Sequence, residues 1–297
     1  MSSKDFNIKG TGVALITPFD KHENIDFSAL GRLIDHCIEG GVDYLVCLGT
    51  TSEYPTLTNN EIEAIKDYTV EYTDNRVPIV LGCGGNNTKE LISKISRADT
   101  SGFSAILSVT PYYNKPSQKG LLTHFRYISS ISSLPLIMYN VPSRTGCNLR
   151  AETVLQLAEE NKNIIALKEA SGDMSQCMEI LRCKPVDFDL LSGEDALTLP
   201  LIACGAKGVI SVSANAFPKQ VSSMVNFALK GTMKRALALH NILLPFTNAI
   251  FEEGNPAGIK SALEIMNLGH NVVRMPLAKV SKALDNKLQN IIKQIQQ

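Results

Sequence analysis

The sequence predicts a (β/α)8 TIM barrel of the α/β class with a C-terminal helical extension. Short apolar runs typical of strands alternate with amphipathic helical patterns along most of the chain. This alternation implies βαβ units and a parallel sheet, and eight such units in a little over 200 residues indicate a closed barrel. The chain also lacks the glycine-rich phosphate turn that a doubly wound sheet normally carries after its first strand.

Eight runs have the length and apolar composition of strands. They are Val13–Thr17, Tyr44–Leu48, Ile79–Gly82, Ala105–Val109, Leu136–Tyr139, Ile164–Lys168, Asp189–Ser192 and Gly208–Val212. Stretches with helical spacing lie between them, namely Phe27–Glu39, Asn59–Tyr72, Thr88–Thr100, Lys119–Ser132, Arg150–Asn161, Met174–Arg182 and Ala196–Cys204. Residues 1–225 are therefore expected to form the barrel.

The strand patterns stop after residue 225. Helical patterns follow over Ala228–Leu244, Gly258–Met266 and Leu277–Ile295, and Asn255-Pro256 separates the first two. One helix completes the barrel and the others are expected to pack on its side. Because no linker rich in Pro, Gly or Ser intervenes, residues 226–297 are expected to extend the barrel as part of one compact unit.

The glycine cluster Gly82-Cys83-Gly84-Gly85 leaves a doubly wound sheet as the second fold to consider. It follows the third run and lacks the G-x-G-x-x-G spacing of a dinucleotide site. We therefore interpret it as a tight turn between a strand and a helix.

Charge and composition exclude several classes of function. The 29 basic and 29 acidic residues form no long run of one sign, which argues against nucleic-acid or membrane-surface binding. The seven cysteines contain no C-x-x-C pair, and the five histidines show no metal-ligand spacing. No signal peptide and no membrane-spanning segment is evident. We expect a soluble cytoplasmic protein with reduced core cysteines and without a metal or cofactor.

Lys168 is the most informative single residue. It lies in the apolar run Ile164–Gly172, where an ammonium is costly to desolvate, so its pKa is expected to fall. A neutral lysine amine can attack a ketone and form a Schiff base. The alternative is a lysine at a strand end whose ammonium reaches solvent.

Other unusual residues also occur where predicted strands end, which is where barrel enzymes carry their active sites. They lie in Gly49–Glu53, Thr110–Pro116, Tyr139–Gly146 and Ser192–Asp195. Each motif alone is weak, because tandem threonines are usually turn residues and paired tyrosines usually pack. Their convergence with Lys168 on one rim of the barrel predicts an active site.

These side chains match the needs of Schiff-base chemistry. Tyr139, Thr50 and Tyr113 can form a chain that moves protons. The Thr50-Thr51 turn can hold a small carboxylate, and Arg144 offers a bidentate clamp for a second one. The alternative for Arg144 is a surface ion pair.

The same segments resemble the 4-hydroxy-tetrahydrodipicolinate synthase (dihydrodipicolinate synthase) family of pyruvate-dependent class I aldolases. The resemblance runs in order from about residue 10 to residue 220. It rests on Gly49-Thr50-Thr51-x-Glu53, Thr110–Gln118, Tyr139–Gly146, Leu167–Gly172, Leu191–Asp195 and Gly208–Val212. The lysine, the first threonine and Tyr-Asn-x-Pro are shared across the aldolases, whereas Ser-Arg-Thr-Gly and Tyr113 favour the synthase.

The resemblance implies a reaction and a set of roles. Pyruvate, bound as a Schiff base on Lys168, would condense with L-aspartate 4-semialdehyde to give 4-hydroxy-tetrahydrodipicolinate, in lysine and diaminopimelate biosynthesis. Tyr139 would be the general acid and base, with Thr50 and Tyr113 completing a relay. The remaining expected contacts are Thr51 to the pyruvate carboxylate, Arg144 to that of the semialdehyde, and backbone groups of Gly193 and Ile210.

The resemblance also implies a homotetramer built as a dimer of dimers, in which Tyr113 enters the neighbouring subunit's site. Lysine-inhibited members have an effector site at that dimer interface. Its matching positions here are Tyr54, Pro55, Asn59, Ile62, Asn86, Glu90 and Tyr112. Asn86, Glu90 and Tyr112 suit lysine, whereas Ile62 replaces a commonly polar side chain and Tyr54 is bulky. We therefore expect weak or absent inhibition by L-lysine.

Two other readings are weighed against the synthase. One is an N-acetylneuraminate lyase or a 2-keto-3-deoxy sugar-acid aldolase, and Arg144 argues against it because a polyhydroxylated substrate needs neutral hydrogen-bond partners. The other is a catalytically silent barrel used for binding, which would be expected to have lost Lys168 or Tyr139.

Overall fold

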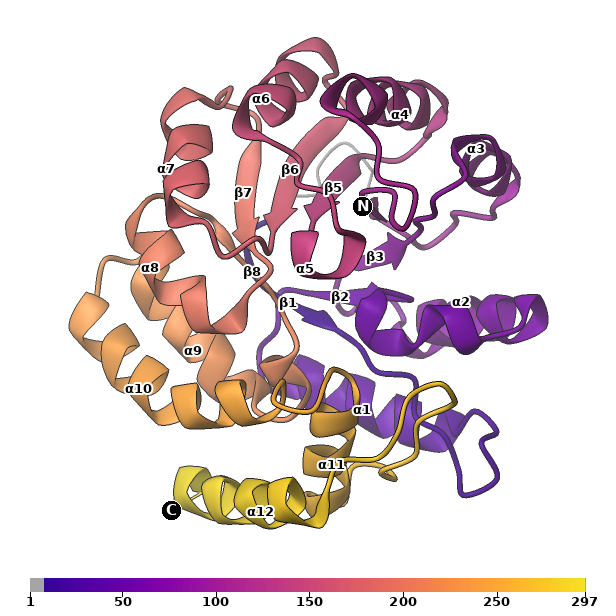
Figure 1. Ribbon diagram of the computed structural model, residues 1–297. Coiled ribbons are helices and arrows are strands. Elements are labelled where there is room, and N and C mark those ends of the chain that lie inside the picture. Colours follow the sequence, from indigo (N-terminus) through magenta and orange to yellow (C-terminus); the bar gives the residue numbers. More distant parts are fainter. Residues whose placement is uncertain (1–7, 297) are drawn as a thin grey trace. The chain divides into compact units, whose positions relative to one another are not determined.

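The computed structural model describes residues 8–296, in which eight strands follow one another around a closed barrel (Figure 1). Neighbouring strands pair in parallel. The strands are β1 (Gly10–Ala14), β2 (Tyr44–Cys47), β3 (Ile79–Gly82), β4 (Ala105–Val109), β5 (Leu136–Asn140), β6 (Ile164–Glu169), β7 (Asp189–Ser192) and β8 (Gly208–Ser211). The predicted (β/α)8 TIM barrel is confirmed.

Helices separate the strands and follow the last one. They are α1 (Phe27–Glu39), α2 (Asn59–Thr73), α3 (Thr88–Arg97), α4 (Gln118–Ile131), α5 (Pro142–Thr145), α6 (Ala151–Glu160), α7 (Met174–Cys183), α8 (Thr198–Ala203), α9 (Pro218–Leu229), α10 (Met233–Ala249), α11 (Ala257–Ile265) and α12 (Lys282–Gln296). The three helices expected after residue 225 correspond to α10, α11 and α12.

Several of these helices begin after a residue whose side chain accepts a hydrogen bond from a backbone amide of the first turn, and these caps define where the helices start. The N-cap residues that accept a backbone hydrogen bond are Asp26, Thr58, Asn87, Ser117 and Asp173. At α2 the cap is reciprocal, because the Glu61 carboxylate also accepts from the Thr58 backbone amide at 2.8 Å.

The first strand differs from the prediction of Val13–Thr17. It runs from Gly10 to Ala14, and it includes two glycines that do not look like strand residues. A methyl group on Gly12 would lie 2.1 Å from the Tyr44 ring. Glycine is disfavoured in strands by its own conformational preference, so this close approach of two strands was not visible in the sequence.

Two helices were not predicted. α9 begins with Pro218 at its first position, where the missing N–H costs no hydrogen bond, and ends before Lys230 and Gly231. The helix predicted over Ala228–Leu244 therefore joined the last residues of α9 to most of α10. α5 has only four residues inside the Tyr139–Gly146 motif, too few for a helical period to show.

The chain divides into two units, and each has its own buried residues. One comprises Pro78–Ile210 with the N-terminal residues, and the other Gly10–Val77 with Ser211–Gln297. In the first, all five residues of β5 are buried, as expected of a parallel strand covered on both faces. In the second, all five residues of β1 are buried. The predicted boundary between a barrel over 1–225 and helices over 226–297 stays a prediction.

The seven cysteines are free thiols. Four of them are buried, namely Cys37, Cys47, Cys147 and Cys177, and match the expectation of core residues. Cys183 and Cys204 are exposed at the end of α7 and after α8, so for these two that expectation is wrong.

Candidate active site

Lys168 and Tyr139 form the centre of the site. The strands β5 and β6 pair so that Tyr139 lies opposite Lys168. Both residues are buried, Tyr139 with 6% exposure and Lys168 with 5%. The Lys168 Nζ atom lies over the Tyr139 ring, 4.3 Å from its centroid. The expectation of a buried lysine is therefore confirmed. The alternative, in which the ammonium group of Lys168 reaches solvent, is not found.

Burial lowers the pKa of Lys168 from 10.5 to about 8, and the positive charge of Arg144 adds to that effect. The negative charges of Asp195 and Glu194 act in the opposite direction. At pH 7 about a tenth of the molecules then carry the neutral amine that can attack a carbonyl.

Glu194 and Asp195 are charged residues of the site to which the sequence analysis gave no role. Burial raises the pKa of Glu194, and the charge of Asp195 does so as well, while Lys168 and Arg144 lower it. The signal was present, because both residues lie within three positions of the end of β7, at the predicted catalytic end of the barrel.

Position 193, beside Lys168, has room for glycine only. A methyl group on Gly193 would lie 3.0 Å from Lys168 Cγ and 2.8 Å from Ala170 Cβ. The Gly193 amide donates to the Glu169 carbonyl at 2.7 Å, which continues the pairing of β6 with β7. Ile210 is 1% exposed within β8.

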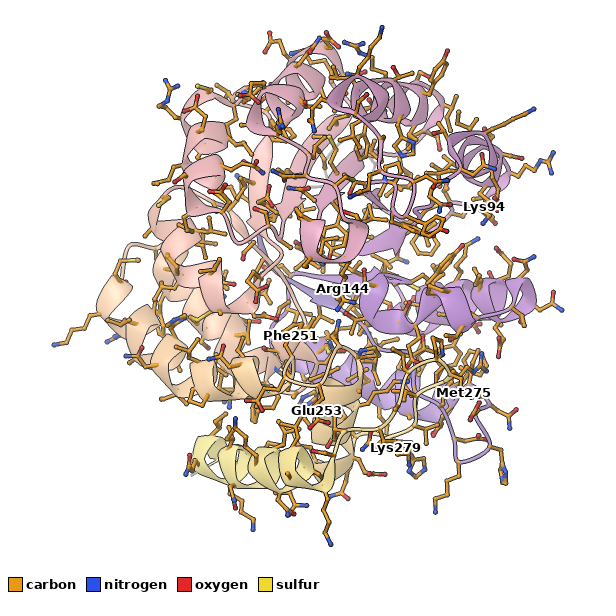
Figure 2. All side chains as sticks on the ribbon, viewed as in Figure 1. Lys94, Arg144, Phe251, Glu253, Met275 and Lys279 are labelled. Atoms are coloured by element: carbon orange, nitrogen blue, oxygen red, sulfur yellow. The ribbon has the colours of Figure 1, made fainter. Side chains whose placement is uncertain are left out.

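Arg144 projects from the short helix α5, directly after β5 (Figure 2). The sequence dictates this turn, because Pro142 starts the helix and Gly146 ends it in the left-handed conformation with φ of 72°. Arg144 is exposed and forms no ion pair with any residue of the described range 8–296. The alternative of a surface ion pair is therefore not found, and the guanidinium is available to a ligand.

The two tyrosines after β4 are exposed. Tyr113 is 84% exposed and has a left-handed backbone with φ of 73°, and Tyr112 is 40% exposed. The Asn86 side-chain amide donates to the Tyr112 carbonyl at 3.3 Å, which joins two of the expected effector positions. The third, Glu90, forms an exposed ion pair of 2.8 Å with Lys94.

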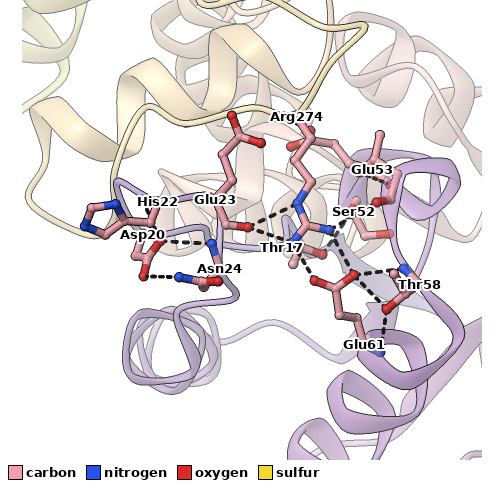
Figure 3. Close-up of polar contacts among 11 residues, drawn as sticks. Thr17, Asp20, His22, Glu23, Asn24, Ser52, Glu53, Thr58, Glu61 and Arg274 are labelled. Atoms are coloured by element: carbon pink, nitrogen blue, oxygen red, sulfur yellow. Dashed lines mark hydrogen bonds and ion pairs between the residues drawn. The ribbon is translucent and has the colours of Figure 1, made fainter.

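The Thr50-Thr51 turn belongs to the unit that contains β1 and β2. Thr50, Thr51 and Ser52 form one turn of 3-10 helix directly after β2 and Gly49. Thr50 is exposed, whereas Thr51 is 2% exposed and its hydroxyl accepts from the Asn255 amide at 3.1 Å. Thr17 donates to the Ser52 carbonyl at 2.8 Å (Figure 3).

Glu53 holds this turn to the C-terminal segment of the same unit. Its backbone is left-handed, with φ of 59°, and its carboxylate is buried. One carboxylate oxygen pairs with the Lys260 ammonium, and the other accepts from the Arg274 backbone amide at 2.9 Å. The Arg274 guanidinium in turn binds Glu61, at the start of α2, with one bond of 2.9 Å (Figure 3).

Two negative findings concern residues 8–296. No group of three or more His, Cys, Asp or Glu side chains in that range is arranged to hold a metal ion. None of its helices combines the length and the apolar character needed to cross a bilayer.

A buried amine beside a tyrosine in a (β/α)8 barrel is an arrangement suited to an enzyme that uses a lysine as its nucleophile. The model of the dihydrodipicolinate synthetase family matches residues 7–295. The chain belongs to this family of lyases.

Individual relatives agree with the family match. A protein from Parabacteroides distasonis named 4-hydroxy-tetrahydrodipicolinate synthase is 46% identical over 98% of both chains. A relative of the same name from Bacillus subtilis is 42% identical over 93% of this chain and 95% of its own. The crystal structure of dihydrodipicolinate synthase from Aquifex aeolicus is similar with a TM-score of 0.94 at 38% identity, covering 97% of this chain and 98% of that one.

Proposed function

We propose that this chain condenses pyruvate with L-aspartate 4-semialdehyde to give 4-hydroxy-tetrahydrodipicolinate. The observation that carries the proposal is the buried Lys168, whose pKa is lowered to about 8, beside Tyr139. The names of the relatives favour this reaction over an N-acetylneuraminate lyase or a sugar-acid aldolase. The reaction belongs to lysine and diaminopimelate biosynthesis.

The reaction proceeds through a covalent adduct on Lys168. The amine attacks the ketone of pyruvate, and the resulting carbinolamine loses water to give the Schiff base. Loss of a proton from the methyl carbon gives an enamine, which attacks the aldehyde carbon of the second substrate. The amino group of that substrate then attacks the imine carbon, which closes the ring and releases the Lys168 amine.

Tyr139 is the general acid and base of these steps, because its ring lies against the amine that forms the adduct. Thr50 and Tyr113 complete the proton relay, and Thr51 holds the pyruvate carboxylate. Arg144 binds the carboxylate of L-aspartate 4-semialdehyde, which its unpaired guanidinium supports. Backbone groups of Gly193 and Ile210 line the site. These roles rest on the match between this sequence and the motifs of the family.

The protein acts as a homotetramer, a dimer of dimers, in the cytoplasm. The 84% exposure of the Tyr113 side chain supports such an assembly, because a tyrosine left bare in one subunit is suited to packing against another. One solved relative is described as the first monomeric variant of dihydrodipicolinate synthase, which implies that other members assemble. Asn86, Glu90 and Tyr112 belong to an effector position at that interface.

The test is the rate of condensation, measured with pyruvate, L-aspartate 4-semialdehyde and an NADPH-dependent reductase that consumes the cyclic product. We expect a robust rate that Lys168→Ala abolishes. Borohydride should trap pyruvate on the wild-type protein and not on that variant. An adduct that persists on another lysine would contradict the assignment of Lys168. Trapped pyruvate without condensation would instead indicate a sugar-acid aldolase.

A further inference from the structure

Asn140 and Glu169 are buried polar residues within two of the motifs, and the proposed mechanism gives neither a role. They pair with each other one position beyond the pair formed by Tyr139 and Lys168. Their exposures are 0% and 1%. Because successive side chains of a strand point to opposite faces, Asn140 and Glu169 lie on the face away from Tyr139 and Lys168.

The Glu169 carboxylate is surrounded by hydrogen-bond donors. The Asn140 side-chain amide lies 3.0 Å from each of its oxygens. The Ser171 backbone amide donates at 2.7 Å, and the Gln176 side-chain amide donates at 3.0 Å. An ionised carboxylate only accepts, so it satisfies all of these donors, whereas a side-chain amide in its place would turn one N–H group toward another.

Asn140 also closes the loop that carries Arg144. Its amide group donates to the Asn148 side-chain oxygen at 2.7 Å, and its own oxygen accepts from the Leu149 backbone amide at 2.9 Å. The loop between these contacts, residues 141–148, contains α5 and therefore Arg144. One buried side chain thus holds the end of the loop against its beginning.

Gln176 connects the two sets of contacts. Its side-chain oxygen accepts from Asn148 at 2.8 Å while its amide donates to Glu169. Glu169 therefore orients both partners of the Asn148 side chain, Asn140 on β5 and Gln176 on α7. An arginine can form two parallel bonds to a carboxylate only if its backbone is held in place, because the pairing depends on orientation.

We propose that Glu169, acting through Asn140 and Asn148, is a positioning residue for Arg144 and so selects for the second substrate's carboxylate. The inference rests on the proposed function, in which Arg144 binds L-aspartate 4-semialdehyde. It goes further by assigning the geometry of that contact to a carboxylate that touches neither substrate.

The first test is Glu169→Gln, which keeps the size of the side chain and replaces an acceptor oxygen with an NH2 group. We expect the KM for L-aspartate 4-semialdehyde to rise about tenfold or more, since a buried donor loses its charged acceptor. The pyruvate concentration that half-saturates borohydride trapping on Lys168 should change by less than about threefold, because Arg144 does not contact pyruvate and affects trapping only through its charge near Lys168. Glu179→Gln makes the same chemical change at an exposed ion pair of α7 and should alter neither value.

A double-mutant cycle separates positioning from general damage. In an Arg144→Ala background, Glu169→Gln should raise the KM for the semialdehyde by less than about twofold, because its target is gone. Gln176→Ala is a milder variant of the same network and should show the same split between the two substrates. An equal rise with and without Arg144, or an equal loss of pyruvate trapping, would overturn the inference.

The two proposals fail in different ways. If the wild-type protein does not trap pyruvate on Lys168, the proposed function is wrong. If the wild-type protein traps pyruvate and condenses it, but Glu169→Gln and Gln176→Ala leave the KM for the semialdehyde unchanged, only the positioning role of Glu169 is wrong.

Discussion

At the scale of single residues, the neighbours of Lys168 act on its charge in opposite directions. Burial and Arg144 favour the neutral amine, while Asp195 and Glu194 favour the ammonium. The balance places the pKa of Lys168 at about 8. This value is close enough to neutral pH for part of the protein to carry the amine that attacks, and the site still tolerates the positive charge that a protonated Schiff base carries.

The rate of borohydride trapping with pyruvate should therefore rise with pH to half its maximum near pH 8. Only the neutral amine attacks the ketone, so the rate follows the deprotonated fraction of Lys168. Arg144→Ala should move this midpoint to higher pH, because it removes a positive charge that lowers the pKa. A wild-type midpoint near the ordinary lysine value of 10.5 would contradict the lowered pKa.

The sign of the linkage to stability is also defined. With a folded-state pKa of about 8 and an ordinary value of 10.5, the unfolded chain binds more protons at Lys168 between these pH values. The cost of burying the charged amine is therefore fully present below pH 8 and is relieved as the pH rises through this window. The buried amine of Lys168 therefore lowers the free energy of unfolding at neutral pH.

At the scale of elements, the turn after β2 depends on a contact with α11. Lys260 is 0% exposed and donates to Glu53 and, at 2.8 Å, to the Val272 carbonyl. Its Nζ atom also lies over the Phe19 ring, 4.0 Å from the centroid. Three groups therefore take up the three N–H bonds of the ammonium.

Lys260→Met should destabilise the protein strongly. The substitution leaves the Glu53 carboxylate buried without its charged partner, and breaking a buried pair in this way costs about 3–5 kcal/mol. The expected result is a lower midpoint of urea unfolding, measured by circular dichroism.

Lys287→Met is the matched control, because Lys287 pairs with Glu252 at the surface. It should change the midpoint little, since exposed ion pairs contribute about 0–1 kcal/mol. Adding Glu53→Gln to Lys260→Met should recover part of the loss by removing the unpaired charge. Equal effects of Lys260→Met and Lys287→Met on the unfolding midpoint would show that the buried pair of Glu53 and Lys260 contributes no more to stability than an exposed pair.

At the scale of the whole molecule, the expected response to L-lysine concerns residues that the resemblance to the family places at a subunit interface. Asn86 and Tyr112 are already joined by a hydrogen bond, and Glu90 is exposed beside Lys94. Ile62 and Tyr54 are the positions at which this chain is expected to differ from lysine-sensitive members.

Condensation should therefore continue at low millimolar L-lysine. An apolar side chain at Ile62 cannot hydrogen-bond the ligand, and a polar group that loses its partner on binding costs affinity. Ile62→Ser restores a hydroxyl and should increase inhibition. The measurement is the coupled rate against lysine concentration for both proteins. Loss of wild-type activity at low millimolar lysine would show that the departures are tolerated.

Several features of the molecule follow from the sequence because their signals are local. The alternation of apolar runs and amphipathic stretches predicted the barrel, since a strand buried on both faces and a helix buried on one face each leave their pattern within a short segment. Lys168 stood out for the same reason, as a charge inside an apolar run. The signals that bound the helix of Arg144, Pro142 at its start and Gly146 at its end, are also local, although this helix was too short to be predicted.

Other features were decided by tertiary contacts alone. Glu53 and Lys260 are 207 positions apart, so no local pattern indicates that they pair. Glycine at position 12 of β1 leaves room for the Tyr44 ring, which lies 32 positions further along the chain and gives no local signal. Asn140 and Glu169 look like ordinary polar residues at strand ends, and only the folded chain brings them together with Asn148. A sequence carries the preferences of neighbouring residues, whereas the bonds of a buried polar group depend on which distant segments the fold places beside it.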